Sequence, residues 1–197
     1  ALLPLWIGKI YQFDGKTLGI RLNGEGGRHQ LLVEAGRRAH LTPAFPAPPK
    51  IPPGFAMLLR KHLYGGRIPE IGQVGMERVF YIAVQKRDAC YRLYLELFDE
   101  GNAILCTEDD TIIKPLWHHR FRERDVVPGS TYALEGIDCT QRSPTEFEGL
   151  LRQSGRDLVR TLAVDCMLGG PYAEEVCRRA GAEKTAPAAE ADAGAVF

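Results

Sequence analysis

The segment 55–78 constrains the fold of this chain more than any other part of it. Its letters, FAMLLRKHLYGGRIPEIGQVGMER, begin with apolar residues at helical spacing, break at a Gly-Gly pair, and continue as a strand that ends at Glu77 and Arg78. The cations of this segment other than Arg78 lie around the predicted break: Arg60, Lys61, His62 and Arg67. No acid precedes Glu70, so we predict a surface for phosphates here. The alternative is a helix end whose cations complement the helix dipole.

Alternating apolar and polar residues predict antiparallel strands through residues 1–127. Leu18, Ile20 and Leu22 repeat at the period of a half-buried strand, and the letters DEGN at 99–102 are typical of a hairpin turn. The predicted strands are 6–11, 18–22, 29–34, 67–73, 77–85, 91–98, 103–107 and 111–113. We therefore expect an α+β fold whose body is an antiparallel β-sandwich, or a twisted pair of sheets, crossed by one or two helices.

Six prolines fall within the eleven positions 43–53. Proline lacks the amide donor that a helix or a central strand needs, so this segment predicts a stiff, polyproline-like connector. We expect Phe45 and Ile51 to pack back onto the body. A docking ligand for a proline-reading domain is the alternative.

Helix signals replace strand signals after Pro128. Ser143 and Pro144 predict a capped helix to about residue 153, Ser154 can cap a second helix over 155–168, and a third runs from Pro171 to Gly181. Two helices joined by a Gly-Gly hairpin form the pattern of a helix-hairpin-helix segment over 128–183. The tail 184–197 is rich in Ala and Glu, which predicts disorder.

Composition excludes several classes of protein. Lys+Arg 25 and Asp+Glu 25 cancel to a formal net charge of +0, which argues against a protein that coats nucleic acid but leaves room for a local basic patch. The five cysteines show no CxxC spacing, as expected of reduced, mostly buried thiols in the cytoplasm. No apolar run predicts a membrane span, and the opening ALLPLW does not predict a signal peptide.

No enzyme motif is recognisable. GxSxG, HExxH and P-loop patterns are missing from the sequence, so we expect no catalytic residues, no cofactor and no small-molecule substrate. A second basic cluster lies at 118–124, and its alternating charges favour an edge strand blunted by charge, with RNA contact as the second interpretation. Its adjacent residues His118 and His119 cannot easily share one zinc ion, so we expect no metal.

Three ordered blocks of this sequence resemble the NFACT-N domain of the RqcH/NEMF/FbpA group. These blocks are YQFDGKTLGIRL at 11–22, FAMLLRKHLYGGRI with QVGMER at 55–78, and LVRTLAVDCMLGGPYAEEVCRRAG at 158–181. The similarity extends from about Trp6 to about Lys184. It implies a fold similar to the N-terminal domain of formamidopyrimidine-DNA glycosylase, and a role in ribosome-associated quality control.

The resemblance also implies partners and a site. Family members bind tRNA and a large ribosomal subunit obstructed by peptidyl-tRNA, and they support untemplated C-terminal tailing of the stalled chain. Glu77 and Arg78 match the family's Asp-Arg pair, which is implicated in recruiting tRNA, although Glu77 is one methylene longer than Asp. The expected tRNA contacts are Glu77, Arg78, Arg60, Lys61 and Arg67.

The hairpin at 167–171 is the expected auxiliary contact for nucleic acid. Its glycines, Gly169 and Gly170, can present free amides at a helix N-terminus, and Arg178 follows two turns later. A plain helix-helix corner is the alternative, and the acids Glu174 and Glu175 favour it.

Two further functions remain open. A DNA-repair lyase of the glycosylase type uses an N-terminal proline amine, whereas this chain begins Ala1-Leu2-Leu3 with Pro4 internal. A protein-interaction module with an adhesin-like role is the other alternative.

Overall fold

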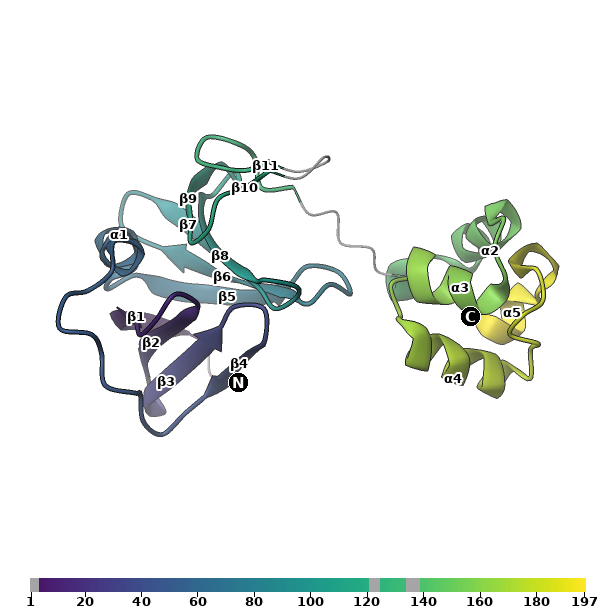
Figure 1. Cartoon of the computed structure of the whole chain (residues 1–197), viewed down its shortest axis with the longest axis horizontal. Coiled ribbons are helices and arrows are strands. Elements are labelled where there is room, and N and C mark those ends of the chain that lie inside the picture. Colours follow the sequence, from purple (N-terminus) through teal and green to yellow (C-terminus); the bar gives the residue numbers. More distant parts are fainter. Residues whose placement is uncertain (1–3, 121–124, 134–138) are drawn as a thin grey trace. The chain divides into compact units, whose positions relative to one another are not determined.

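The computed structural model describes residues 4–120, 125–133 and 139–197, and it contains two compact units (Figure 1). The sheet unit comprises residues 1–74 and 78–134, and the helical unit comprises residues 75–77 and 135–197. The sheet unit extends beyond the expected boundary at residue 127, because Tyr132 is buried in a cluster with residues of the sheet.

Nine strands of the described chain form one antiparallel sheet in the order β4-β3-β2-β1-β5-β6-β7-β8-β9. They are β1 Leu5–Gln12, β2 Thr17–Gly24, β3 Gly27–Glu34, β4 Arg38–Leu41, β5 Arg67–Gln73, β6 Val79–Gln85, β7 Cys90–Glu96, β8 Asn102–Thr107 and β9 Ile112–Pro115. The antiparallel α+β class is therefore confirmed, but the division into two sheets is wrong. Strand β1 pairs with β2 on one side and with β5 on the other, which joins both halves.

The sheet curls until two distant turns touch. The amide of Gly36, between β3 and β4, donates to the carbonyl oxygen of Glu96 at 2.9 Å. Gly101, between β7 and β8, lies so close that a Cβ atom on it would stand 1.7 Å from the Gly36 nitrogen. The ion pair between Lys16 and Glu100, at 2.8 Å, spans the same seam. Right-handed twist accumulated over many strands accounts for such closure.

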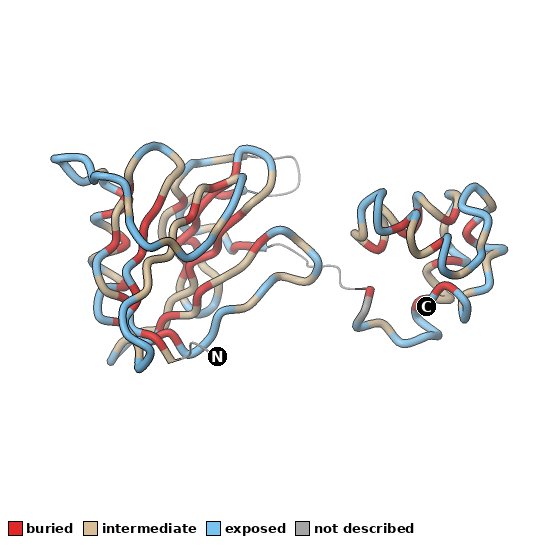
Figure 2. Tube along the Cα trace, turned by 90° about the horizontal axis from the view of Figure 1, so that it is seen from below, coloured by how far each residue is buried: buried red, intermediate tan, exposed pale blue. Residues whose placement is uncertain are grey.

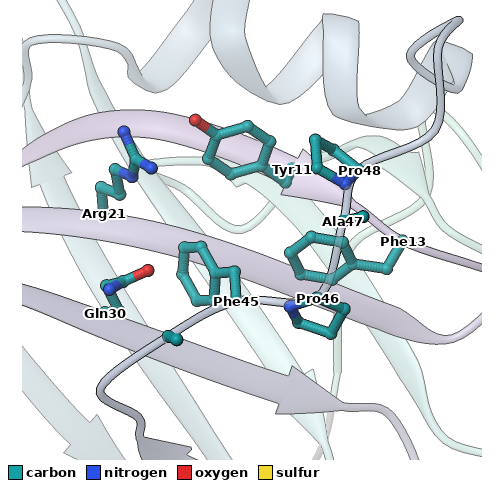
Figure 3. Close-up of a pocket in the computed structure, with 9 residues that line it drawn as sticks. Tyr11, Phe13, Arg21, Gln30, Phe45, Pro46, Ala47 and Pro48 are labelled. Atoms are coloured by element: carbon teal, nitrogen blue, oxygen red, sulfur yellow. The ribbon is translucent and has the colours of Figure 1, made fainter.

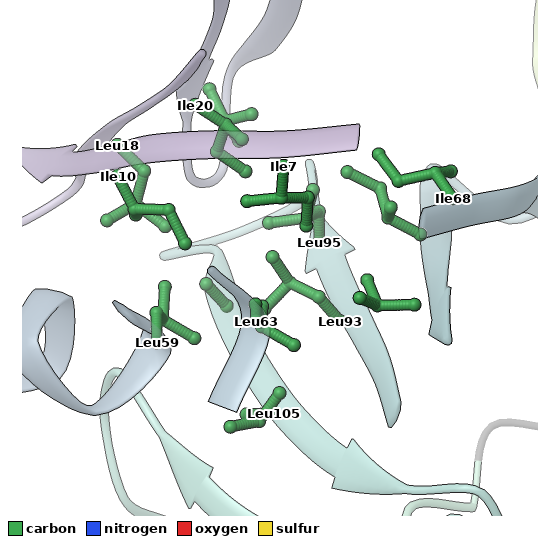
Figure 4. Packing of buried hydrophobic residues seen from close by; sticks show 14 of the residues in the cluster. Ile7, Ile10, Leu18, Ile20, Leu59, Leu63, Ile68, Leu93, Leu95 and Leu105 are labelled. Carbon is green, nitrogen blue, oxygen red and sulfur yellow. The ribbon is translucent and has the colours of Figure 1, made fainter. Parts of the chain in front are cut away.

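Helix α1, Gly54–Leu63, packs on the concave face of the curled sheet (Figure 4). Its apolar side places Leu59 and Leu63 against residues of the first strands, among them Ile10, and against residues of β7 and β8. The helix begins after Pro53, as expected from the fixed φ of proline. Its last turn carries the predicted basic residues.

Burial alternates along β1 and β2. Figure 2 shows buried stretches interspersed with exposed and intermediate ones along the tube of the sheet unit. Ile10 and Ile20 face the core, whereas their neighbours Tyr11 and Arg21 lie on the outer face. The outer face is the one that the proline-rich connector crosses. Phe45 packs there as predicted, with ring centroids 5.7 Å from Tyr11, but Ile51 is 84% exposed, so the expectation for Ile51 is wrong.

The helical unit has its own core. Helix α2, Pro144–Gln153, starts with the predicted cap, in which the Ser143 side chain and Glu146 form a reciprocal capping box. The next helix is capped by Asp157 rather than Ser154 and runs as α3, Leu158–Arg160, and a π-helical turn η2, Thr161–Asp165. Helix α4, Gly170–Ala180, ends at Gly181 in the left-handed region, φ 63°.

The structure differs from the disordered tail predicted at 184–197. The tail contains the 3-10 turn η3, Ala188–Glu190, and the short helix α5, Ala193–Val196. Ala188 and Val196 are buried in the same core as α2 and α4. Composition misleads here because alanine, although common in polar tails, is also small and apolar enough to pack closely between helices. Helix-hairpin-helix geometry remains a prediction.

Candidate nucleic-acid interface

The basic end of α1 is held against β1 at Ile10, beyond the residues that pair with β5. Arg60 Nε donates to the carbonyl oxygen of Ile10 at 2.6 Å, which fixes this guanidinium beside the strand. Lys61 is exposed and forms no ion pair within the described residues. His62 is different: burial, and secondly the charge of Lys61, lower its pKa, and its ring lies 5.2 Å from that of Tyr91. The positive charge at neutral pH therefore comes from Arg60 and Lys61.

Tyr11 lies between two arginines. The Arg21 guanidinium carbon is 5.3 Å from the centroid of the Tyr11 ring, and that of Arg60 is 5.7 Å from it. Both distances fall within the range of cation–π attraction. Arg21 stands on this face because β2 places it two residues beyond Gly19, which pairs with Tyr11.

Two hollows meet at Tyr11. The first, of about 360 Å³, has aromatic and proline-rich walls and contains Arg21 and Gln30 (Figure 3). The second, of about 560 Å³, is shallower and is lined by Lys9, Arg60 and Lys61 together with apolar side chains. An aromatic hollow beside a basic one has the composition that single-stranded nucleic acid requires.

Arg67 belongs to a neighbouring basic corner. It opposes Gln85 across the β5–β6 pair, and the next residue, Lys86, donates its Nζ to the carbonyl oxygen of Tyr64 at the end of α1. Arg87 follows in the same exposed turn. The structure therefore brings Arg67 close to the end of α1, although it does not line the hollow that Arg60 and Lys61 share.

Glu77 and Arg78 lie elsewhere. They belong to the bend that precedes β6, not to the end of a strand, and Arg78 is exposed while Glu77 is partly buried. The register places Arg67 opposite one end of β6, and Arg78 precedes the other end. At about 3.3 Å per residue, this separates the two arginines by roughly 20 Å. The five predicted tRNA-binding residues thus form two groups rather than one cluster.

The hairpin of the helical unit carries little free charge. Gly169 and Gly170 are exposed, with Gly169 at φ 73°. The Gly169 amide, however, is not free as expected, because it donates to the carbonyl oxygen of Ala163 at 3.1 Å. Arg178, however, is bound through two nitrogens to Glu175, at 2.8 and 2.6 Å. Hydrogen bonds from Arg178 and then Arg179 lower the pKa of Glu175 to about 2, so this carboxylate stays charged. An arginine held in this way is a weaker phosphate ligand than a free one.

Charge pairing distinguishes the two units. In the helical unit, the side chains of six cations are ion-paired: Arg152, Arg156, Arg160, Arg178, Arg179 and Lys184. In the described part of the sheet unit, the exposed cations without an acidic partner include Lys9, Arg21, Lys61, Arg67, Arg78 and Arg87. The neutral sum of the sequence therefore conceals a positively charged surface on the sheet unit.

The second basic cluster forms a separate ribbon. Strand β10, His119–Arg120, pairs with β11, Asp125–Val126, as a two-stranded sheet. Strand β10 is therefore an edge strand, as predicted, although not an edge of the nine-stranded sheet. Arg122 and Arg124 lie outside the described residues. Across the described chain, no three His, Cys, Asp or Glu side chains gather in a way that could hold a metal ion. In the same residues, no helix is long and apolar enough to cross a membrane.

The residues around Tyr11 were missed as a site, although the block YQFDGKTLGIRL contains Tyr11, Phe13 and Arg21. The structure explains the rest of that block. Asp14 accepts from the amides of Lys16 and Thr17, at 2.8 and 2.7 Å, which fixes the β1–β2 turn. At Gly19, a Cβ atom would stand 2.7 Å from the Phe13 ring, so glycine leaves space for aromatic side chains on the outer face.

Comparison with known proteins identifies the family of this chain. A family model described as the NFACT N-terminal and middle domains matches residues 1–196. The chain belongs to this family. Its relatives include the archaeal Rqc2 homolog aRqcH of Methanocaldococcus jannaschii, 36% identical over 81% of this chain, and the human ribosome quality control complex subunit NEMF, 34% identical over 64%. The chain spans 25% of the archaeal relative and 12% of the human one.

Two solved structures of streptococcal proteins have the same fold. The N-terminal part of the fibronectin/fibrinogen-binding protein of Streptococcus suis is 26% identical, with a TM-score of 0.74 over 89% of this chain and 72% of that one. The N-terminal domain of the fibronectin-binding protein PavA of Streptococcus pneumoniae is also 26% identical, with a TM-score of 0.70 over 88% of this chain and 75% of that one. The family resemblance read from the sequence is confirmed.

Proposed function

We propose that this chain is an RNA-binding module of ribosome-associated quality control that acts in the cytoplasm. In this proposal it binds tRNA and the obstructed large ribosomal subunit with its peptidyl-tRNA, and it supports C-terminal tailing of the stalled nascent chain. It positions substrates and makes no bond itself. The names of its NFACT relatives, which are ribosome quality control factors from archaea to humans, support the cellular role.

The observation that carries the RNA-binding part is the gathering of unpaired cations on the sheet unit. Arg60 and Lys61 share one hollow, and Arg67 lies in the adjacent corner. Unpaired lysine and arginine side chains release counterions when they bind phosphates, which drives affinity for nucleic acid. Paired cations, such as those of α4, must break their ion pairs with carboxylates before they can bind phosphates.

Arg78 extends this surface along the sheet. It is exposed, and its side chain forms no hydrogen bond or ion pair within the described residues. A stacked nucleic-acid strand advances about 3.4 Å per nucleotide, so roughly six nucleotides would reach from Arg67 to Arg78. A folded RNA such as tRNA is large enough to contact both groups at once. Arg78 can bind a phosphate through two nitrogens, which lysine cannot.

Filter binding of total tRNA at two salt concentrations tests the proposal. We expect salt-sensitive binding, and Arg78→Ala should weaken it about tenfold, because a hydrogen bond to a charged group contributes about 1.5–3 kcal/mol. The matched control is Arg37→Ala. Arg37 is also an exposed arginine of the sheet unit, but it is held by Glu34 at 3.0 Å. Binding that does not depend on salt, or equal losses for both variants, would contradict the proposal.

Protein interaction is the second candidate, because the solved streptococcal relatives are described as fibronectin-binding proteins. It predicts binding to a protein partner that changes little with salt. The titration above separates the two functions, since counterion release makes RNA binding fall steeply as salt rises.

A further inference from the structure

We propose that the aromatic hollow beside Tyr11 is a binding pocket for one unpaired nucleobase of an RNA strand. This inference rests on the proposed RNA-binding function and goes beyond it, because it assigns a base contact to residues outside the cationic positions named above. The hollow has a volume of about 360 Å³, within the range of ligand pockets. It is therefore large enough for one base but not for a folded helix.

The walls of the pocket are suited to stacking. The rings of Tyr11 and Phe13 are nearly parallel, with an interplanar angle of 11° and centroids 6.0 Å apart. Phe45 meets Tyr11 with an interplanar angle of 63°, so its ring closes one side (Figure 3). Unpaired RNA bases commonly stack on aromatic rings and on arginine planes, and Arg21 supplies such a plane at the Tyr11 ring.

The pocket also offers hydrogen-bonding groups. Gln30 donates its Nε2 to the carbonyl oxygen of Pro43 at 2.8 Å, which leaves its Oε1 without a hydrogen bond in the described chain. Arg21 brings guanidinium donors with no acidic partner there. An acceptor and several donors at the rim of an aromatic pocket match the edge of a base, whereas a purely apolar ligand would leave them unpaired.

The neighbouring hollow explains why the ligand should be part of a strand. Tyr11 lines both hollows, and the second one carries Lys9, Arg60 and Lys61. A base stacked in the first hollow would place its flanking phosphates toward these cations. The sequence keeps room for the aromatic walls, since glycine at residue 19 leaves the space that the Phe13 and Phe45 rings occupy. Base, sugar and phosphate would thus each meet a fitting surface.

The test uses a single-stranded oligoadenylate with one fluorescent purine analogue, together with an abasic strand of the same length. We expect the full chain to bind the oligoadenylate several-fold more tightly than the abasic strand and to quench the analogue. Phe45→Ala should weaken oligoadenylate binding about tenfold, abolish the quenching and leave the salt slope unchanged, because stacking is lost and no phosphate contact is removed.

Ile51→Ala is the matched control, since Ile51 lies in the same connector but is 84% exposed. It should behave as the wild type. Lys61→Ala should lower the salt slope by about one while quenching persists. Arg21→Met provides a second pocket variant should Phe45→Ala perturb the fold, which circular dichroism would reveal.

The outcomes separate this inference from the proposed function. If tRNA and both oligonucleotides bind with a salt-dependent affinity, but the abasic strand binds equally well and Phe45→Ala equals Ile51→Ala, the base pocket is refuted and the RNA-binding function stands. If no RNA binds at low salt, both are refuted. Tighter binding of the base-bearing strand that depends on Phe45 and Arg21 supports the pocket.

Discussion

The contact between the turns at Gly36 and Gly101 predicts a large effect of one methyl group. In Gly101→Ala, the added Cβ would stand 1.7 Å from the Gly36 nitrogen and 2.2 Å from the Ala35 carbonyl carbon. These are backbone atoms, so no side-chain rotation relieves the overlap. Gly101 also has φ 70°, a left-handed conformation that costs a residue with a Cβ about 1–2 kcal/mol.

Overpacking of this kind costs about 1–3 kcal/mol, so Gly101→Ala should destabilise the sheet unit by about 2–5 kcal/mol in total. Gly129→Ala separates the two contributions. Gly129 lies in the same unit at φ 87°, but a Cβ there would meet no atom within 4 Å. Gly129→Ala should therefore lower the free energy of unfolding only by the conformational cost, about 1–2 kcal/mol.

Urea unfolding followed by tryptophan fluorescence measures this difference. The chain has two tryptophans, Trp6 and Trp117, and both lie in the sheet unit, so the signal reports on that unit alone. Equal losses of unfolding free energy in Gly101→Ala and Gly129→Ala would show that the two turns do not touch and would refute the closed seam.

Three further predictions concern a turn, a cap and the tail. Burial alone raises the pKa of Asp14, but hydrogen bonds from Lys16 and Thr17 outweigh it and lower the pKa. Asp14→Ala should therefore destabilise the sheet unit above about pH 4, and the loss of unfolding free energy should shrink as the pH falls through the pKa of the folded state. Urea titrations from pH 7 to pH 2 measure this. Ser143→Ala should cost the helical unit about 1 kcal/mol through loss of the capping box, measured by hydrogen exchange of α2 amides. Val196→Ala should cost about 1–2 kcal/mol and speed exchange in α4, whereas a disordered tail would leave exchange unchanged.

Local patterns predicted much of this fold because they act over short distances. The capping box at Ser143, the stop at Gly181 and strand β5 follow from neighbouring residues alone. Sheet topology does not, because the β1–β5 pairing joins strands that are separated by the connector and α1. For that reason the sequence predicted a body divided between two sheets, whereas β1–β9 form a single sheet.

The candidate site shows the same limit. The basic end of α1 was visible because its cations are consecutive, but the contact of Arg21 with Tyr11 depends on strand register. Arg78 and Arg67 are close in sequence yet lie at opposite ends of a hairpin. The ion pairing of cations, which differs between the two units, cannot be read from a count of charged residues either.

The seam between the turns of the first four strands and the β7–β8 turn also sets an order of events during synthesis. Lys16 and Glu100, which it brings together, are 84 positions apart. Strands β1–β4 therefore leave the ribosome with their apolar face uncovered. Helix α1 can cover part of that face, but the core is complete only when β7 and β8 have followed. Contacts between residues so far apart in sequence slow folding and prolong the exposure of apolar, aggregation-prone surface. A nascent chain of this family is thus itself a candidate for chaperone binding until the hairpin of β7 and β8 emerges.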